Sequence, residues 1–356
     1  MRTIIQQTFL LLVRQGIGHG GVLPDVVDWP AIQALANEQG LAAVVIDSVE
    51  RLPAGNRPPK MLLLQWIGDV LQGYENRYDL YRQAIVELAG FYNAHGFKMM
   101  VLKGYACSLD WPKPKHRPCG DIDIWLFGKQ KEVDDLLAKE KGIKVDVSHH
   151  HHTVFFWQGF SVENHYDFVN VHSQKSSAKL EKIFKSLGED DNHFIEVMGE
   201  KVYIPSPDLH ALFLIRHMAC HFAASGITVR QVLDWAFFAE KHCKEVNWEW
   251  LVRLLEEYHM KDFFHVINAI CVEDLGFSPS IFPMARILPG VKERVLDDIL
   301  EPEYPSKMPK NLLKRLVYKW QRWQGNAWKQ EMCYGESRWS MFWTGIWAKI
   351  LKPASI

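Results

Sequence analysis

Residues 97–127 contain two short apolar runs separated by a polar loop with prolines, and this arrangement constrains the fold most. The second run, 120–127, places Asp121 and Asp123 between large apolar residues. Side chains alternate between the two faces of a strand, so both acids share one face and the intervening isoleucines share the other. The first run, 99–102, reads as a second strand. The pattern predicts a sheet that carries two carboxylates on one face.

A Lys-Gly turn directly follows the first apolar run, at Lys103 and Gly104. A glycine lets backbone N–H groups come close to a phosphate, and a lysine adds positive charge. Paired carboxylates are the oxygen ligands that Mg²⁺ prefers, and two-metal sites use such acids in phosphoryl and nucleotidyl transfer. Spacing alone therefore predicts a site for divalent metal and phosphate.

Composition excludes several classes of protein. The chain has 356 residues, enough for two or three domains, and 48% of them are hydrophobic, so it can bury a sizeable core. Its net charge of −1 argues against a long nucleic acid as partner. The six cysteines lack CxxC spacing, which is typical of reduced thiols rather than of a disulfide framework or a zinc ribbon. With no apolar run of about 18 residues and no cleavage site of a signal peptide, we expect a cytoplasmic protein without a transmembrane segment.

The hydrophobic pattern predicts an α+β fold in three regions. Residues 1–95 have helical periodicity and are expected to form a helical layer on the sheet, and 205–356 are expected to form a helical C-terminal domain. Between them, 96–204 read as a small mixed sheet with helices, the α/β core. Its expected strands are 99–102, 121–127, 143–147, 153–158, 160–168 and 201–204, with a helix at 129–141, and 173–200 read as a polar stretch.

The expected strand 160–168 supplies a third acid. Period-2 alternation places Glu163, His165 and Asp167 on one of its faces. Glu163, Asp167 and Asp146 are the candidates for the third carboxylate.

These motifs together resemble those of a known family. An LKG turn, then R-P-x-G-D-I-D-I at 117–124, then an acid two residues before a histidine, Glu163 and His165, resemble the nucleotidyltransferase superfamily that includes DNA polymerase beta. The nearest likeness is to its bacterial branch of uncharacterised nucleotidyltransferases, closely over about 95–170 and more loosely over the helical half. Most of the superfamily has Gly-Ser where this chain has Lys-Gly.

The resemblance implies Mg²⁺-dependent transfer of a nucleoside monophosphate from an NTP such as ATP to a hydroxyl-type acceptor, with release of pyrophosphate. Two Mg²⁺ ions would bind the catalytic carboxylates Asp121, Asp123 and Glu163, and Glu163 could instead be the general base. The implied nucleotide-binding residues are Lys103, Gly104, Arg117, Gly120 and His165, with Arg117 as a bidentate phosphate clamp. The acceptor is left open between a small molecule, a protein side chain and an RNA end, with a long nucleic acid disfavoured.

Other residues have more ordinary interpretations. The tract 149–152 is four histidines, which could bind a transition metal but read more simply as an exposed run. His217 and His221 have zinc-ligand spacing without the glutamate of HExxH, so we interpret them as core or substrate-facing. Arg230 and Asp234 read as an i,i+4 helix pair.

The C-terminal tail is basic and rich in tryptophan. Trp339, Trp343 and Trp347 form one helical stripe. The stripe could lie on a membrane surface or stack on nucleobases, but packing on the rest of the protein is the simpler interpretation.

Two rival functions remain. One is a non-catalytic relative that binds a nucleotide or a partner. The other is a metal-dependent hydrolase, which requires the histidines 149–152 to converge on Asp121.

Overall fold

The computed structural model describes residues 2–351 apart from 150, 172, 173, 175, 190, 191, 285, 286 and 305–308. Its strands form a six-stranded mixed sheet in the order β3-β4-β2-β1-β6-β5. The strands are β1 (Met100–Val101), β2 (Ile122–Trp125), β3 (His152–Trp157), β4 (Phe160–His165), β5 (Phe194–Val197) and β6 (Glu200–Tyr203). The predicted α+β class is confirmed.

The register of the sheet brings the sequence-distant acids together. β2 and β4 are parallel neighbours, and Asp123 pairs with Glu163 across them. β1 runs antiparallel to β2 and parallel to β6, while β3/β4 and β5/β6 are hairpins. Paired residues on adjacent strands point to the same face, so the side chains of Asp123 and Glu163 lie side by side.

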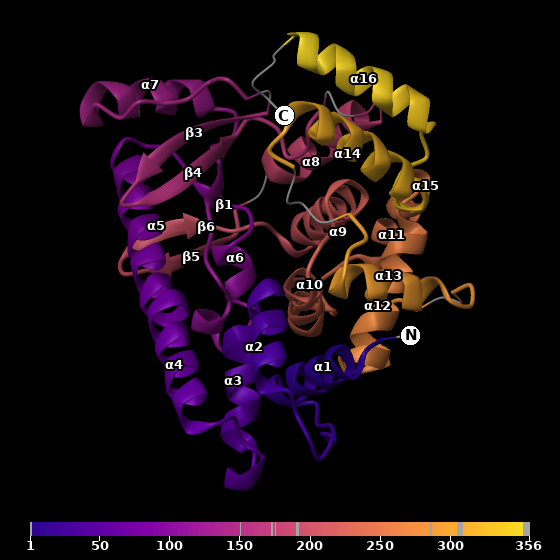
Figure 1. Ribbon diagram of the computed structural model, residues 1–356. Helices are drawn as coiled ribbons and strands as arrows, with labels where there is room; N and C mark the ends of the chain where they lie inside the picture. The colour runs from indigo at the N-terminus through magenta and orange to yellow at the C-terminus, as the bar shows by residue number, and fades with distance from the viewer. Residues whose placement is uncertain are drawn as a thin grey trace.

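Helices surround the sheet and form most of the remaining structure (Figure 1). They are α1 (Ile4–Gly16), α2 (Trp29–Glu38), α3 (Ala42–Arg51), α4 (Lys60–Val70), α5 (Arg77–Ala94), α6 (Tyr105–Ser108), α7 (Gln130–Lys141), α8 (Ser177–Glu189), α9 (Pro207–Ala224), α10 (Val229–His242), α11 (Trp248–Glu257), α12 (Lys261–Ala269), α13 (Val291–Leu300), α14 (Leu312–Gly325), α15 (Ala327–Cys333) and α16 (Arg338–Leu351). A π-helical segment, Leu71–Asn76, joins α4 to α5.

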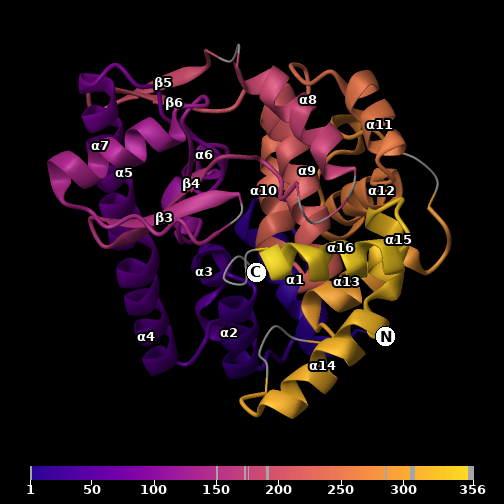
Figure 2. The ribbon, with the colours of Figure 1, turned by 90° about the horizontal axis from the view of Figure 1, so that it is seen from above.

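Two hydrophobic clusters divide the interior. α5 and α7 cover one face of the sheet, where Ile122, Ile124 and Val162 are fully buried. The second cluster holds side chains of α1–α4, α8–α13 and the other sheet face, including Trp125. Figure 2 shows this separation, with the sheet, α5 and α7 on one side and α8–α12 on the other. The division into regions 1–95, 96–204 and 205–356 remains a prediction.

The structure differs from the sequence-based expectations in three segments. The polar stretch 173–200 contains α8, whose Leu180 and Phe184 are buried at helical spacing, and also β5. β5 and β6 meet at Met198 and Gly199, both with positive φ, and methionine gives no turn signal in a sequence. The expected strand 143–147 is wrong, because it forms only an isolated bridge from Asp146 to Val154.

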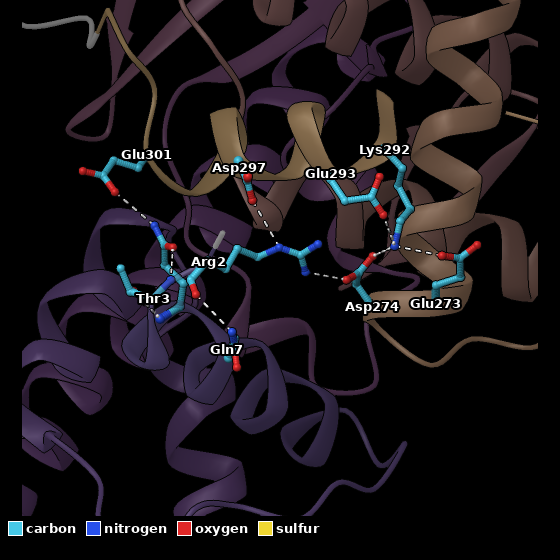
Figure 3. Close-up of polar contacts among 10 residues, drawn as sticks. Arg2, Thr3, Gln7, Glu273, Asp274, Lys292, Glu293, Asp297 and Glu301 are labelled. Carbon is cyan, nitrogen blue, oxygen red and sulfur yellow. Dashed lines mark hydrogen bonds and ion pairs between the residues drawn. The ribbon is translucent and has the colours of Figure 1, made fainter. Parts of the chain in front are cut away.

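The chain's first residues are fastened to its helical half by charged contacts (Figure 3). Arg2 donates to Asp274 at 2.8 Å and to Asp297 of α13 at 3.2 Å. Lys292 donates to the other oxygen of Asp274 at 2.9 Å. Asp274, with 10% of its side chain exposed, therefore joins the N-terminus and α13.

The tryptophan stripe is only partly packed. Trp339 and Trp343 are 56% and 55% exposed, which goes against internal packing for these two side chains, although Trp339 contacts Trp323 and Phe342. The Trp347 side chain lies outside those described. Among the described helices, none combines the length and the apolar character needed to cross a membrane.

We predict that Asp274→Ala lowers the free energy of unfolding by about 1–2 kcal/mol, because two cations lose their shared partner in a partly buried place. Urea unfolding measures this change. The control Glu293→Ala removes an exposed acid 3.7 Å from Lys292 and should cost less than about 0.5 kcal/mol. Equal losses in the two variants would contradict the joining role of Asp274.

Candidate functional site

A cavity of about 370 Å³ lies between the sheet and the helices α9 and α10. The sheet side contributes the turn after β1 and the segment that leads into β2. The helices contribute both apolar and basic side chains. The lining residues are Lys103, Gly104, Cys107, Arg117, Pro118, Cys119, Gly120, Asp121, Asp123, Leu214, His217, Met218, His221, Arg230, Gln231 and Asp234.

Asp123 is the most buried acid of the site, with 2% exposed. Its Oδ1 lies 2.7 Å from Lys103 Nζ and 3.0 Å from His165 Nε2. Burial alone would raise the pKa of Asp123, but Lys103 and His165 outweigh it and hold this pKa well below its ordinary value. Asp123 is therefore an anion with two cationic partners.

His165 connects Asp123 to Glu163. Its Nε2 lies 3.5 Å from Glu163 Oε2, in addition to the contact with Asp123. Burial would lower the pKa of His165, but hydrogen bonds to Asp123 and Glu163 raise it to about 9. The same bond from His165 lowers the pKa of Glu163. At neutral pH the imidazole is thus a cation between two carboxylates.

The alternatives for the third acid lie elsewhere. Asp167 forms an ion pair with Lys185 at 2.6 Å, beyond the end of β4. Asp146 is exposed and accepts a hydrogen bond from the backbone of Ser148. Of the three candidates, only Glu163 groups with Asp123 and His165, with ligand atoms within 4.8 Å of one another.

Asp121 precedes β2 and reaches the cavity from the strand's start. It is not part of the group formed by Asp123, Glu163 and His165. Burial, and then the nearby charge of Asp123, raise the pKa of Asp121. The two aspartates are therefore electrostatically coupled, with the more exposed one at the cavity wall.

The turn after β1 positions Lys103 against the acids. Burial would lower the pKa of Lys103, but Asp123 and Asp121 outweigh it and raise it. Gly104 has φ +56°, and a Cβ there would collide with the hydroxyl of Tyr81. That hydroxyl donates to the carbonyl of Asp121 at 2.8 Å, so Tyr81 ties the turn to the start of β2. The sequence offers no signal for Tyr81, which lies on the core face of α5.

Arg117 points its guanidinium at Asp234 rather than at open space. Arg117 Nε and one terminal nitrogen bind the two carboxylate oxygens at 2.7 and 2.9 Å. Trp111 Nε1 donates to the same carboxylate at 2.9 Å, and Arg230 lies 3.8 Å from it. The residue expected to clamp phosphate is therefore engaged in a buried pair that joins the loop before β2 to α10.

The helix α9 presents His217 and His221 to the cavity, with ring centroids 4.4 Å apart. Burial, followed by the charge of Lys103, lowers the pKa of both imidazoles. Arg230 of α10 adds a guanidinium to the same lining. The sequence favoured core, substrate-facing or helix-pair roles for these three side chains. The structure places them in the cavity wall, opposite the acids.

Among the described histidines of the tract, none belongs to a ligand group that contains Asp121. His151 and His152 converge instead on His165, with ring centroids 5.9 and 5.4 Å from it. His152 faces His165 because the two are paired in the β3/β4 register. His150 lies outside the described residues. The hydrolase hypothesis required convergence on Asp121, so this arrangement gives it no support.

The donor chemistry of the site suits a hard divalent cation. Asp123 and Glu163 offer oxygen ligands at close range, and Asp121 adds a third carboxylate at the wall. In the structure, Lys103 and His165 compensate the buried negative charge of Asp123. The residues therefore fit a metal that would take over from Lys103 as a counter-charge of Asp123.

The fold and the site are those of a mixed α+β protein with a charged cavity, whose wall contains Lys103 and Asp123, with Asp123 paired to Glu163 on the adjacent parallel strand. The particular family follows from comparison. The model of the uncharacterised nucleotidyltransferase family matches residues 25–276, and the chain belongs to this family. The match includes every residue of the cavity lining. Comparison with curated proteins gives no match, and neither does comparison with solved structures.

We predict that Asp234→Ala lowers the free energy of unfolding by about 3–5 kcal/mol, because it leaves the guanidinium of Arg117 buried without its partner. Thermal or urea unfolding measures the change. Asp135→Ala is the control, since the pair of Asp135 with Lys131 is fully at the surface and contributes less than about 0.5 kcal/mol. A loss for Asp234→Ala as small as the control's would refute the structural role of the pair.

Gly104→Ala should destabilise the protein by about 1–3 kcal/mol, because a strained φ and a collision with Tyr81 act together. Gly96→Ala is a matched control: Gly96 also has positive φ, +78°, but open space around its Cβ position. It should lose only about 1 kcal/mol. Comparison of the two unfolding midpoints separates the collision from the strain, and identical midpoints would argue against the collision.

Proposed function

We propose that the protein is a Mg²⁺-dependent enzyme that transfers a nucleoside monophosphate from an NTP to a hydroxyl-type acceptor and releases pyrophosphate. The observation that supports this most is the pairing of Asp123 with Glu163 on parallel strands beside Lys103. Membership of the nucleotidyltransferase family supports the reaction class. We also place the family in the bacterial branch of the polymerase beta-like superfamily and the protein in the cytoplasm.

In this proposal Asp121, Asp123 and Glu163 hold the metal, with two ions in the full complex. The metal supplies Lewis acidity at the transferring phosphate and lowers the pKa of an attacking oxygen. The lowered pKa of Glu163 makes it a weak base, so its ligand role is favoured over general-base catalysis. The three carboxylates themselves would hold the metal in position and balance its charge.

Lys103 has two partners in succession. Without substrate its ammonium compensates Asp123. With a cation held by the carboxylates, Lys103 would be available to the triphosphate, next to the backbone of Gly104 and Gly120 in the cavity wall. Arg230, from α10, faces the same space and supplies further positive charge, whereas Arg117 holds the wall through Asp234. His165 would keep Asp123 oriented.

The cavity lies at the lower end of ligand-pocket sizes, roughly 300–1,000 Å³. Its apolar wall, Leu214 and Met218, can accept a base or a small acceptor. We therefore propose a small molecule or a protein side chain as acceptor, and not a long nucleic acid.

A non-catalytic nucleotide- or partner-binding relative is the second candidate. The contact of Lys103 and His165 with Asp123 favours it, because such a buried ion-paired cluster is stable without metal. Asp121 also lies outside the group formed by Asp123, Glu163 and His165, which favours the second candidate as well.

Calorimetric titration of each NTP with Mg²⁺ tests the proposal. The wild type should bind at least one NTP, and Asp123→Asn and Glu163→Gln should each weaken binding or turnover by about 100-fold or more. Asp146→Asn, an exposed acid on the sheet edge, should change nothing. Turnover is measured as pyrophosphate release with candidate acceptors. Absence of NTP binding by the wild type would refute both candidates that involve a nucleotide, and binding without release would favour the second.

A further inference from the structure

Three histidines on β3, β4 and the bend before β3 form a cluster next to the carboxylate site. One ligand atom from each of His151, His152 and His165 lies within 4.8 Å of the other two. His152 and His165 are 7% and 5% exposed, and His151 is half-buried. Buried polar rings such as these normally have hydrogen-bond partners.

Here those partners are missing. The Nδ1 atoms of all three rings are buried and have no hydrogen-bond partner among the described residues. A buried polar nitrogen without a partner lowers the stability of the folded state, so three at one place are a persistent destabilising feature of the protein alone. A cation that the three rings coordinated through these nitrogens would remove this cost.

Two of the three rings are in the state that a metal requires, and His165, a cation at neutral pH, would release a proton when it binds the ion. Burial, and then repulsion by the neighbouring histidine, lowers the pKa of His151 to about 3. Burial lowers that of His152 to about 4. Both rings are therefore neutral at physiological pH and offer a lone pair, as metal coordination needs.

His165 has the partner arrangement of a metal-bound imidazole. Its Nε2 faces Asp123 at 3.0 Å, which leaves Nδ1 for a ligand. Metal-ligating histidines usually donate the second ring N–H to a carboxylate, which fixes the orientation of the ring. Asp123 and Glu163 would thus serve as the outer support of this cluster while they line the other site.

We propose that His151, His152 and His165 bind a divalent transition-metal ion of the zinc type, separate from the Mg²⁺ site and connected to it through the ring of His165. Three imidazoles suit zinc, copper or nickel, whereas Mg²⁺ prefers oxygen. A tetrahedral ion with Zn–N bonds of about 2.0–2.1 Å needs nitrogens about 3.3 Å apart, so small ring rotations complete the site. A fourth ligand, such as water, would complete the tetrahedron.

Titration of the purified, metal-free full-length protein with Co²⁺, followed by visible absorption, tests this site. The wild type should bind one equivalent with the intense bands of four-coordinate, nitrogen-ligated cobalt, and Zn²⁺ should displace it. His151→Ala/His152→Ala should weaken binding by at least about 100-fold. His95→Ala alters an exposed histidine paired with Glu140 and should bind like the wild type. Absence of Co²⁺ bands in the wild type overturns the proposal.

Further measurements separate this site from the carboxylates and from misfolding. If the double variant still binds Zn²⁺ as tightly as the wild type, the ion sits at Asp123, Glu163 and His165, and the proposal is wrong. Glu163→Gln should retain the cobalt bands with an affinity lower by about 10-fold, as expected for an outer-shell change. Zn²⁺ should also raise the unfolding midpoint of the wild type but not of the double variant, whose own midpoint reports on its fold. Unchanged wild-type stability at saturating Zn²⁺ would contradict the site.

Discussion

The buried negative charge of Asp123 is the constraint on which the site's arrangement depends. A carboxylate that is 2% exposed must be compensated, and the chain provides the ammonium of Lys103 and the imidazole of His165. Each comes from a different strand end, so the compensation requires β1, β2 and β4 to be neighbours. The compensation of Asp123 therefore depends on the strand order, since a changed order would leave a buried charge unpaired.

A second buried ion pair connects the sheet side of the cavity to the helical half. Arg117 stands four residues before Asp121, and its bidentate contact with Asp234 fixes the loop against α10. The cavity wall is therefore built from two regions that are distant in sequence but held by a directional contact. A bidentate pair fixes orientation as well as distance, which an apolar contact does not.

Local sequence patterns predicted much of the fold and of the site. The rest depends on contacts between residues that are distant in sequence, which local patterns do not reveal. The alternation around Asp121 and Asp123 predicted β2, and the same alternation predicted that Glu163 and His165 share one strand face, because period 2 is local information. That Glu163 joins the two aspartates was implied by the family resemblance. The partner of Arg117 could not be predicted, since a phosphate and a carboxylate attract a guanidinium equally. The convergence of His151 and His152 on His165 depends on hairpin register, whereas α8 was missed although Leu180 and Phe184 stand at helical spacing in the sequence.

The contact of Asp274 with Arg2 and Lys292 has a consequence for the boundaries of the folded unit. The family match ends at residue 276, yet Asp274 fastens both the chain's first residues and α13, which lie outside the match. α13 also buries Val295, Leu296, Ile299 and Leu300 in the large cluster, each contributing about 1.5–3 kcal/mol. The region shared with the family is therefore not self-sufficient in this protein: a chain cut to 25–276 would expose an apolar groove and leave an acid without its cations.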